Sequence, residues 1–208
     1  MIESPVRPTT LPRAPGFRDV RFVDVPEKRF FMIDGRGSPE TDPAFGAAIQ
    51  TLYPVAYTLK FGLKSGRGIN VKVGALEGLF TTDLEHTGLD LAEPGQAMQK
   101  TDWAWTLMLP IPDEATDEEI SGAVEDVRRK KAPPAIERLR VEAFHEGLCA
   151  EIKHVGPYSA EIPTIERLHA AIAAAGYRPR GRHHEIYIGD PNRSAPEKLK
   201  TLIRQPIE

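Results

Sequence analysis

The sequence predicts an α+β fold built from two β-α-β-β modules with a ligand cleft between them. Two observations support this prediction. The order of the predicted elements in residues 19–112 recurs in residues 135–208, and each half contains one amphipathic helix among several short strands. Each sheet needs a helix to cover its apolar face, and two such modules can pair their sheets around a concave surface that suits a ligand. The repeat lies in the order of elements and not in the residues themselves.

Composition and charge narrow the class of protein. The chain has 208 residues, 40% hydrophobic and 27% charged, with a formal net charge of −3, which is typical of a globular domain with its own core. A nucleic-acid partner or an anionic membrane would call for a clustered basic excess, which is missing. No apolar run is long enough to span a bilayer, no signal peptide opens the chain, and Cys149 is the single cysteine. We therefore expect a cytoplasmic, reduced protein.

The first half contains an arm, three strands and one helix. Residues 1–18 are rich in Pro, Thr and Arg without periodicity, and we expect them to form a flexible arm. A strand within residues 27–37 precedes a helix over residues 41–63, where apolar residues recur at spacings of three and four and Pro54 is expected to introduce a kink. The other elements expected here are strands at 70–80 and 101–109 and a loop or flap at 81–100.

A connector helix is predicted over residues 116–131. Thr116 and Glu119 have the spacing of a capping box, which favours a helix start at this point. The basic run at residues 128–131 would then form the last helical turn, where cations meet the negative end of the helix dipole. This position favours a helix end over a phosphate-binding patch.

The second half follows the same order as the first. Residues 140–154 are expected to form one long strand, and a turn at residues 156–159 leads into a helix that closes at Gly176. The residues expected to point inward from this helix are Ile162, Ile165, Leu168 and Ile172. The last two strands are expected at residues 183–188 and 199–207.

The strand at residues 183–188 is the most informative part of the chain. Because side chains alternate along a strand, His184 shares one face with two isoleucines, and His183, Glu185 and Tyr187 share the other. The first face is apolar enough to meet a core. A carboxylate on the second face either forms a buried ion pair with a nearby arginine or lysine or is available to a ligand.

Other aromatic and acidic side chains are candidates for the same site. The candidates are Tyr53, Tyr57, Glu77, Trp103, Trp105 and Tyr158. The first two tyrosines share a helical stripe that could face a cavity. The tryptophans lie on one strand face, either as core residues or as flat walls for a planar ligand. The third tyrosine begins a helix, where packing or capping competes with ligand contact, and the glutamate ends a strand, either in solvent or across the cleft.

Several kinds of catalytic site have no support in the sequence. His183 and His184 point to opposite faces of their strand, so they cannot bind one metal ion together. No Gly-x-Ser-x-Gly occurs, and Cys149 is expected to be a buried strand residue. The loop at residues 66–68 is not followed by the helix that a phosphate-binding loop requires. We therefore predict no metal and no cofactor.

Many ordered segments resemble the GyrI-like small-molecule-binding proteins, which are related to the effector-binding domains of multidrug-sensing transcription regulators. The resemblance covers roughly residues 20–207. The matching segments are MIDGRG at 32–37, LY at 52–53, AYTLKF at 56–61, LEGL at 76–79, DWAWTLM at 102–108, EGLC at 146–149, HVGPY at 154–158, the strand at 183–188 and PEKLKTLIRQP at 196–206.

The resemblance implies a fold and a site. The implied fold is two β-α-β-β modules related by pseudo-two-fold symmetry, and the pocket glutamate of the drug-sensing relatives corresponds to Glu185. No helix-turn-helix precedes the domain, so the chain is similar to the stand-alone branch, which includes proteins that hydrolyse cyclopropane-bearing toxins. The implied partner is a planar or lipophilic small molecule, cationic in some cases.

These observations lead to three functional hypotheses. In the first, the protein hydrolyses strained electrophiles: Glu185 would deprotonate a water, and Tyr187 or Tyr158 would donate to the oxygen that gains charge. Trp103, Trp105, Tyr53, Tyr57, Glu77 and His183 would contact the ligand. In the second hypothesis, the same carboxylate and aromatic rings only bind and sequester lipophilic cations. In the third, which rests on the family name, the chain inhibits a large protein partner.

Overall fold

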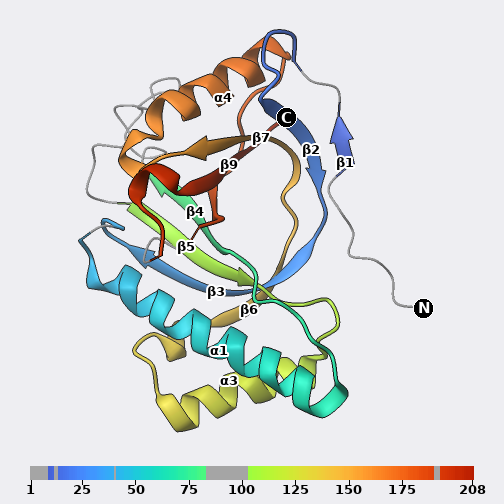
Figure 1. The fold of residues 1–208 in the computed structure, drawn as a ribbon, viewed down its shortest axis with the longest axis vertical. Helices are drawn as coiled ribbons and strands as arrows, with labels where there is room; N and C mark the ends of the chain where they lie inside the picture. The colour runs from blue at the N-terminus through green and yellow to red at the C-terminus, as the bar shows by residue number, and fades with distance from the viewer. Residues whose placement is uncertain (1–8, 12–13, 40, 83–102, 190–192) are drawn as a thin grey trace. The chain divides into compact units, whose positions relative to one another are not determined.

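The computed structural model describes residues 9–11, 14–39, 41–82, 103–189 and 193–208, and it confirms the α+β class (Figure 1). The chain divides into two compact units. The first unit comprises Met1–Glu27, Glu77–Thr101 and His145–Glu208, and the second comprises Lys28–Leu76 and Asp102–Phe144. The units differ from the two sequence halves, because Glu77 and the residues after it group with the C-terminal part of the chain. The arm expected at 1–18 and the loop expected at 81–100 lie largely outside the described residues.

The first unit is a sheet covered by one helix. Its strands are hydrogen-bonded in the order β1 (Thr9–Leu11), β2 (Val20–Val25), β7 (Gly147–Val155), β9 (Lys200–Pro206), β8 (His183–Tyr187) and β4 (Leu76–Thr82). The pairs β1–β2, β2–β7, β7–β9 and β9–β8 are antiparallel. In the register of β8 on β9, Glu185 lies opposite Ile203 and Tyr187 opposite Thr201.

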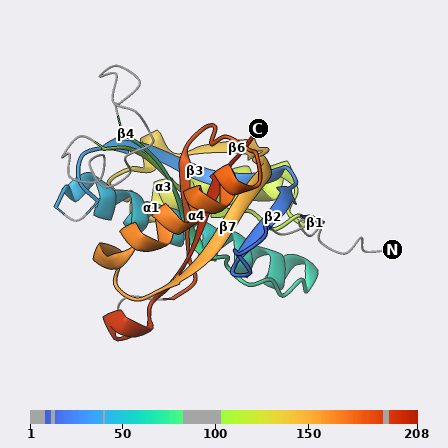
Figure 2. The same ribbon diagram turned by 90° about the horizontal axis from the view of Figure 1, so that it is seen from above.

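Helix α4 (Ile162–Ala174) packs on this sheet (Figure 2). Its apolar residues recur at spacings of three and four, so they form one stripe, and the buried members are Ile165, Leu168, Ala171 and Ile172. This stripe shares a core with Val20, Phe22, Ala150, Ile152 and Ile203 of the strands. Short 3-10 turns, η3 (Tyr158–Ala160) and η4 (Pro196–Lys198), precede α4 and β9.

The second unit has three strands and two long helices. The strands are hydrogen-bonded in the order β5 (Trp103–Pro110), β3 (Lys28–Arg36) and β6 (Arg140–Phe144), all antiparallel. Helix α1 (Pro43–Arg67) is capped by the Asp42 side chain, which accepts from the Ala44 N–H at 2.8 Å, and it continues through Pro54. Helix α3 (Asp117–Lys131) packs beside α1, and a 3-10 turn, η2 (Ile136–Arg138), leads to β6.

The connector helix has the predicted ends. The Thr116 hydroxyl accepts from the Glu119 N–H, and the Glu119 carboxylate accepts from the Thr116 N–H, which confirms the capping box. The basic run at 128–131 forms the last turn, where Arg128 pairs with Glu125 and Glu137, and Arg129 and Lys130 pair with Asp126. These pairs explain the run without a phosphate ligand.

Two predicted strands differ from the structure. The single long strand predicted over 140–154 is wrong: β6 ends at Phe144 and pairs with β3, whereas β7 begins at Gly147 and pairs with β2 and β9. Gly147 has a φ of +71°, a left-handed conformation that breaks the extended chain. The strand predicted from residue 70 begins only at Leu76. No helix in the described parts of the chain is long and apolar enough to cross a membrane.

Candidate ligand-binding site

Strand β8 presents a hydrogen-bonded row of polar side chains on one face. The Tyr187 hydroxyl donates to Oε2 of Glu185 at 2.8 Å, and Nε2 of His183 lies 3.2 Å from Oε1. His183 and Tyr187 therefore each contact one oxygen of the Glu185 carboxylate, because side chains two positions apart on a strand lie on the same face. The Glu185 side chain is 14% exposed, so the carboxylate lies near the surface without being fully solvated. We call these three residues the Glu185 row.

A second carboxylate, Glu161, lies close to the Glu185 row. Turn η3 carries Tyr158, whose ring meets the Tyr187 ring edge-on at a centroid distance of 5.4 Å, and Glu161 follows directly before α4. Glu161 is 1% exposed. Its Oε1 atom is buried and has no hydrogen-bond partner among the described residues, and its side chain does not cap α4. A buried polar atom in this state is costly unless something binds it.

The surroundings of Glu161 favour its protonated form. Burial, and then the charge of Glu185, raise the pKa of Glu161 from 4.5 to about 8, against a smaller lowering by the Thr201 hydroxyl. A carboxyl group with a pKa raised to this value favours its protonated form at neutral pH. Burial and the charge of Glu185 also raise the pKa of Tyr187 well above its usual range, so this phenol remains a hydrogen-bond donor.

Two imidazoles lie around Glu185. Burial, and then the charge of His183, lower the pKa of His169 on α4, which places a second imidazole near the row. Within the described ranges, no arginine or lysine lies within ion-pair distance of Glu185. Among the described residues, Glu185 therefore forms no ion pair with arginine or lysine.

The opposite face of β8 carries a buried charge network, which the sequence analysis did not predict. His184 is 1% exposed, with Nδ1 2.8 Å from Oε1 of Glu146 and Nε2 3.0 Å from Oε2 of Glu77. Burial alone would lower the pKa of His184, but the charges of Glu146 and Glu77 outweigh it and raise the pKa to about 9. His184 is thus an imidazolium between two carboxylates.

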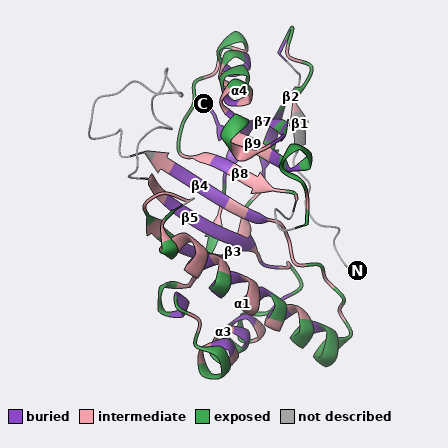
Figure 3. Cartoon of the chain, turned by 60° about the vertical axis from the view of Figure 1, so that its left-hand side comes forward, coloured by how far each residue is buried: buried purple, intermediate pink, exposed green. Residues whose placement is uncertain are grey.

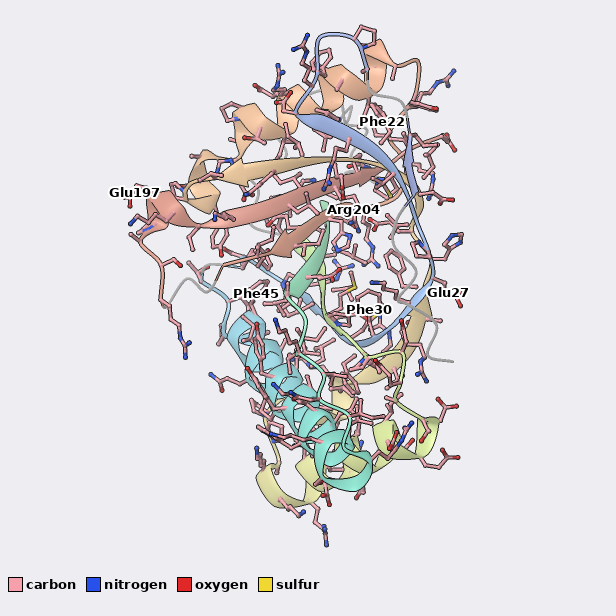
Figure 4. The ribbon with its side chains drawn as sticks, turned by 45° about the vertical axis from the view of Figure 1, so that its right-hand side comes forward. Phe22, Glu27, Phe30, Phe45, Glu197 and Arg204 are labelled. Atoms are coloured by element: carbon pink, nitrogen blue, oxygen red, sulfur yellow. The ribbon has the colours of Figure 1, made fainter. Side chains whose placement is uncertain are left out.

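Two arginines complete this network. Arg204 of β9 (labelled in Figure 4) donates to Oε2 of Glu146 at 2.8 Å and to Glu151 at 3.0 Å, and Arg21 of β2 lies 2.6 Å from Glu151. Against the effect of burial, His184 and Arg204 lower the pKa of Glu146. Three cations, Arg21, Arg204 and His184, therefore balance three carboxylates, Glu77, Glu146 and Glu151.

The structure brings together some of the predicted site residues. Glu185, Tyr187, His183 and Tyr158 gather in the first unit. Glu77 also lies in this unit, but it pairs with His184 on the far face of β8 from Glu185.

The remaining predicted site residues belong to the second unit. Tyr53 and Tyr57 lie on α1, and Trp103 and Trp105 lie on β5. Trp105 is 1% exposed, packs edge-on against Phe45 and lies so close to Gly35 that no Cβ would fit there, which favours a packing role. The ligand roles of Tyr53, Tyr57 and Trp103 stay predictions.

Sequence reasoning missed Glu161 and the charge network. A glutamate at the start of a helix is an ordinary stabilising choice, so nothing in the local pattern marked Glu161. Its environment is set by Glu185, which comes 24 positions later in the chain. The one available signal was its place three residues after Tyr158, which was itself a candidate.

Comparisons with known proteins give one family. A family model described as "GyrI-like small molecule binding domain" matches residues 18–208. An uncharacterized conserved protein from Listeria innocua has 34% sequence identity and a TM-score of 0.79 over 92% of this chain and 93% of its own. A hydrolase from Listeria innocua has 34% identity and a TM-score of 0.75 over 92% of each chain. The C-terminal domain of EcmrR, with 12% identity and a TM-score of 0.56 over 91% and 96% of the two chains, shares the fold alone. The comparison with curated proteins gives no match.

Proposed function

The chain belongs to the GyrI-like small molecule binding domain family, and from this premise we propose that it binds small molecules beside the Glu185 row and hydrolyses strained, cyclopropane-type electrophiles there. One observation carries the proposal: the Glu185 carboxylate, held by Tyr187 and His183, lies near a buried glutamate, Glu161, whose Oε1 atom has no hydrogen-bond partner among the described residues. Burial and the charge of Glu185 raise the pKa of Glu161. Neighbouring carboxyl groups with different protonation states are suited to act as base and acid in one reaction. The similarity to a Listeria innocua hydrolase at 34% identity adds support.

In the proposed reaction one water molecule adds to the substrate, with Glu185 as the base and Glu161 as the acid. Glu185 accepts a proton from a water whose oxygen attacks a methylene carbon of the ring. The carbon–carbon bond breaks, and its electrons move to a conjugated carbonyl oxygen in the substrate. Glu161 then gives its proton to that oxygen. The product has gained one water, and the reaction needs no cofactor.

The pair would return to its starting state without an outside proton. After one turnover Glu185 holds a proton and Glu161 has lost one. Passing a proton from Glu185 to Glu161 restores both groups, and their strong electrostatic interaction indicates that they are close. The sequence suggested that Tyr187 donates to the substrate oxygen. In this scheme it does not, because its hydroxyl already donates a hydrogen bond to Oε2 of Glu185. Tyr187 would orient the base, and Glu161 would act as the acid.

The test is incubation with a cyclopropane-containing alkylator, followed by mass analysis for a gain of one water. Because a general base or acid typically contributes about 10²–10⁴-fold, Glu185→Gln and Glu161→Gln should each lower turnover by about 100-fold or more. Glu166→Gln is the matched control, since Glu166 is an exposed glutamate of α4. A wild-type rate equal to the rate in buffer would refute hydrolysis.

A second function, binding without chemistry, is favoured by the absence of a lysine or arginine partner for Glu185 in the described residues. An uncompensated carboxylate beside two tyrosine rings suits a lipophilic cation. Glu185→Gln should then weaken a cationic dye by about 1.5–3 kcal/mol, roughly tenfold or more, and leave a neutral dye of the same shape unchanged. Equal effects on both dyes, measured by fluorescence titration, would count against charge-based binding.

A further inference from the structure

Helix α1 exposes a row of aromatic side chains. Tyr53, Tyr57 and Phe61 lie four residues apart, and their rings stack with centroid distances of 6.3 and 6.2 Å. Tyr57 is 44% exposed and Phe61 is 58% exposed. The helix is largely exposed along its last turns, where the row ends (Figure 3). Large apolar side chains gathered in this way are typical of contact surfaces.

A hollow lies next to the end of this row. It has a volume of about 1040 Å³ and is lined by residues 58, 59 and 61–66 of α1 together with Glu119, Gly122, Ala123 and Asp126 of α3. Gly62, Gly66 and Gly122 have no atom within 4 Å of the position a Cβ would occupy, so these glycines leave the hollow open. Phe61 stands on its rim, and the buried Leu59 and Leu63 form its floor.

Charges of both signs surround the hollow. Lys64 lies on its α1 side, and Lys60 holds its Nζ 5.8 and 5.9 Å from the Tyr57 and Phe61 ring centroids. Glu119 and Asp126 lie on its α3 side. None of the buried polar atoms that lack a partner in the described residues belongs to the lining, so nothing here is arranged to orient a small polar ligand.

We propose that this face of the second unit is an isologous interface with a second copy of the chain. In such an interface the same patch meets itself, so a projecting side chain and the hole that receives it must lie on one face. Phe61 and the glycine-lined hollow meet this condition. Phe61 of each copy enters the hollow of the other. A 25-residue helix is about 38 Å long, which offers length for an interface of ordinary size.

The test uses the full chain and two glycines of α1. Gly62 and Gly46 both lie within the helix with nothing near a Cβ position, but only Gly62 lines the hollow. Leucine at either position favours the helix, so both variants should fold, as circular dichroism would verify. Sedimentation velocity over a range of concentrations should show a dimer for wild type and Gly46→Leu and a monomer for Gly62→Leu.

Phe61→Ala gives an independent measurement. Loss of an aromatic anchor at the centre of an interface should raise the dimer dissociation constant about thirtyfold or more. A wild-type chain that stays monomeric at every concentration would overturn the proposal. So would a dimer that persists in Gly62→Leu, or one that Gly46→Leu disrupts equally.

Discussion

The charged side chains on the two faces of β8 differ in whether they have partners of opposite charge. On the back face, the carboxylates of Glu77, Glu146 and Glu151 are each paired with a cation. On the front face, Glu185 and Glu161 lie near each other, and no lysine or arginine of the described residues pairs with Glu185. One oxygen of Glu161 also has no hydrogen-bond partner in the described residues. The paired charges stabilise the contacts between the strands of the first unit. A carboxyl group without a partner favours the binding of a ligand that supplies one.

The largest expected difference between the faces is in stability. Glu146→Gln removes the carboxylate shared by His184 and Arg204 and leaves two buried cations short of a partner. Removing one member of a buried ion pair typically costs about 3–5 kcal/mol, and we expect a loss in the free energy of unfolding of that size. Urea denaturation at pH 7 measures it.

Glu161→Gln is the matched change on the front face. At or below about pH 4.5, where Glu161 is mostly protonated in both the folded and the unfolded state, an amide of the same shape should change the free energy of unfolding by less than about 1 kcal/mol. At pH 7 Glu161→Gln should be at least as stable as wild type, because only the wild-type side chain ionises on unfolding. If the two variants lost equal stability, the distinction between a structural and a ligand-directed face would fail.

The pH dependence of stability also distinguishes the two faces of β8, with a smaller expected effect. The pKa of Glu161 is raised from 4.5 to about 8, so the folded state keeps a proton that the unfolded state loses, and stability falls as pH rises from about 4.5 through 8. The pKa of His184 is raised from 6.5 to about 9, so its contribution is fully present below 6.5 and is lost as pH rises through 9.

Comparison of Glu161→Gln with wild type separates the loss of stability at alkaline pH into a part due to Glu161 and a part due to His184. Each unit of pKa difference corresponds to about 1.4 kcal/mol, so Glu161→Gln should exceed wild type by more than about 1 kcal/mol at pH 8.5 relative to pH 5. The free energy of unfolding of Glu161→Gln should still decrease as pH rises from 6.5 through about 9, where His184 loses its contribution. Chemical denaturation at half-unit steps of pH measures both, and parallel curves for wild type and Glu161→Gln would contradict the assignment.

A small effect is also expected for Tyr187→Phe. This change removes the hydrogen bond to Oε2 of Glu185 and keeps the ring that meets Tyr158, while His183 still contacts Oε1. The net value of one such bond is about 0.5–1.5 kcal/mol. Thermal unfolding should show a correspondingly small decrease, and a loss as large as that of Glu146→Gln would show that the front row is also structural.

Local signals predicted the helices and most of the strands, but they missed β2 and predicted the contacts between distant residues poorly. The connector helix, α4 and β8 follow from capping and periodicity, which act within a few residues. The break between β6 and β7 does not, because it depends on each strand pairing with a different partner.

The site shows the same limit. Alternation along β8 placed Glu185 and Tyr187 on one face, as the structure has them. The burial of His184 among charges depends on Glu146, 38 positions away, and the proton of Glu161 depends on a fold that brings it to Glu185.

Strand β8 has a consequence for how this protein can change. Its odd-numbered positions face the candidate site and its even-numbered position 184 faces the ion network, so variation at one set leaves the other in place. If the proposed function holds, substitutions at His183 and Tyr187 should alter ligand preference and leave the ion network in place, so these are the positions for a focused library around Glu185. A single-residue insertion in the strand is the opposite case. It would turn His184 toward the ligand and Glu185 into the network, and both functions would be lost together.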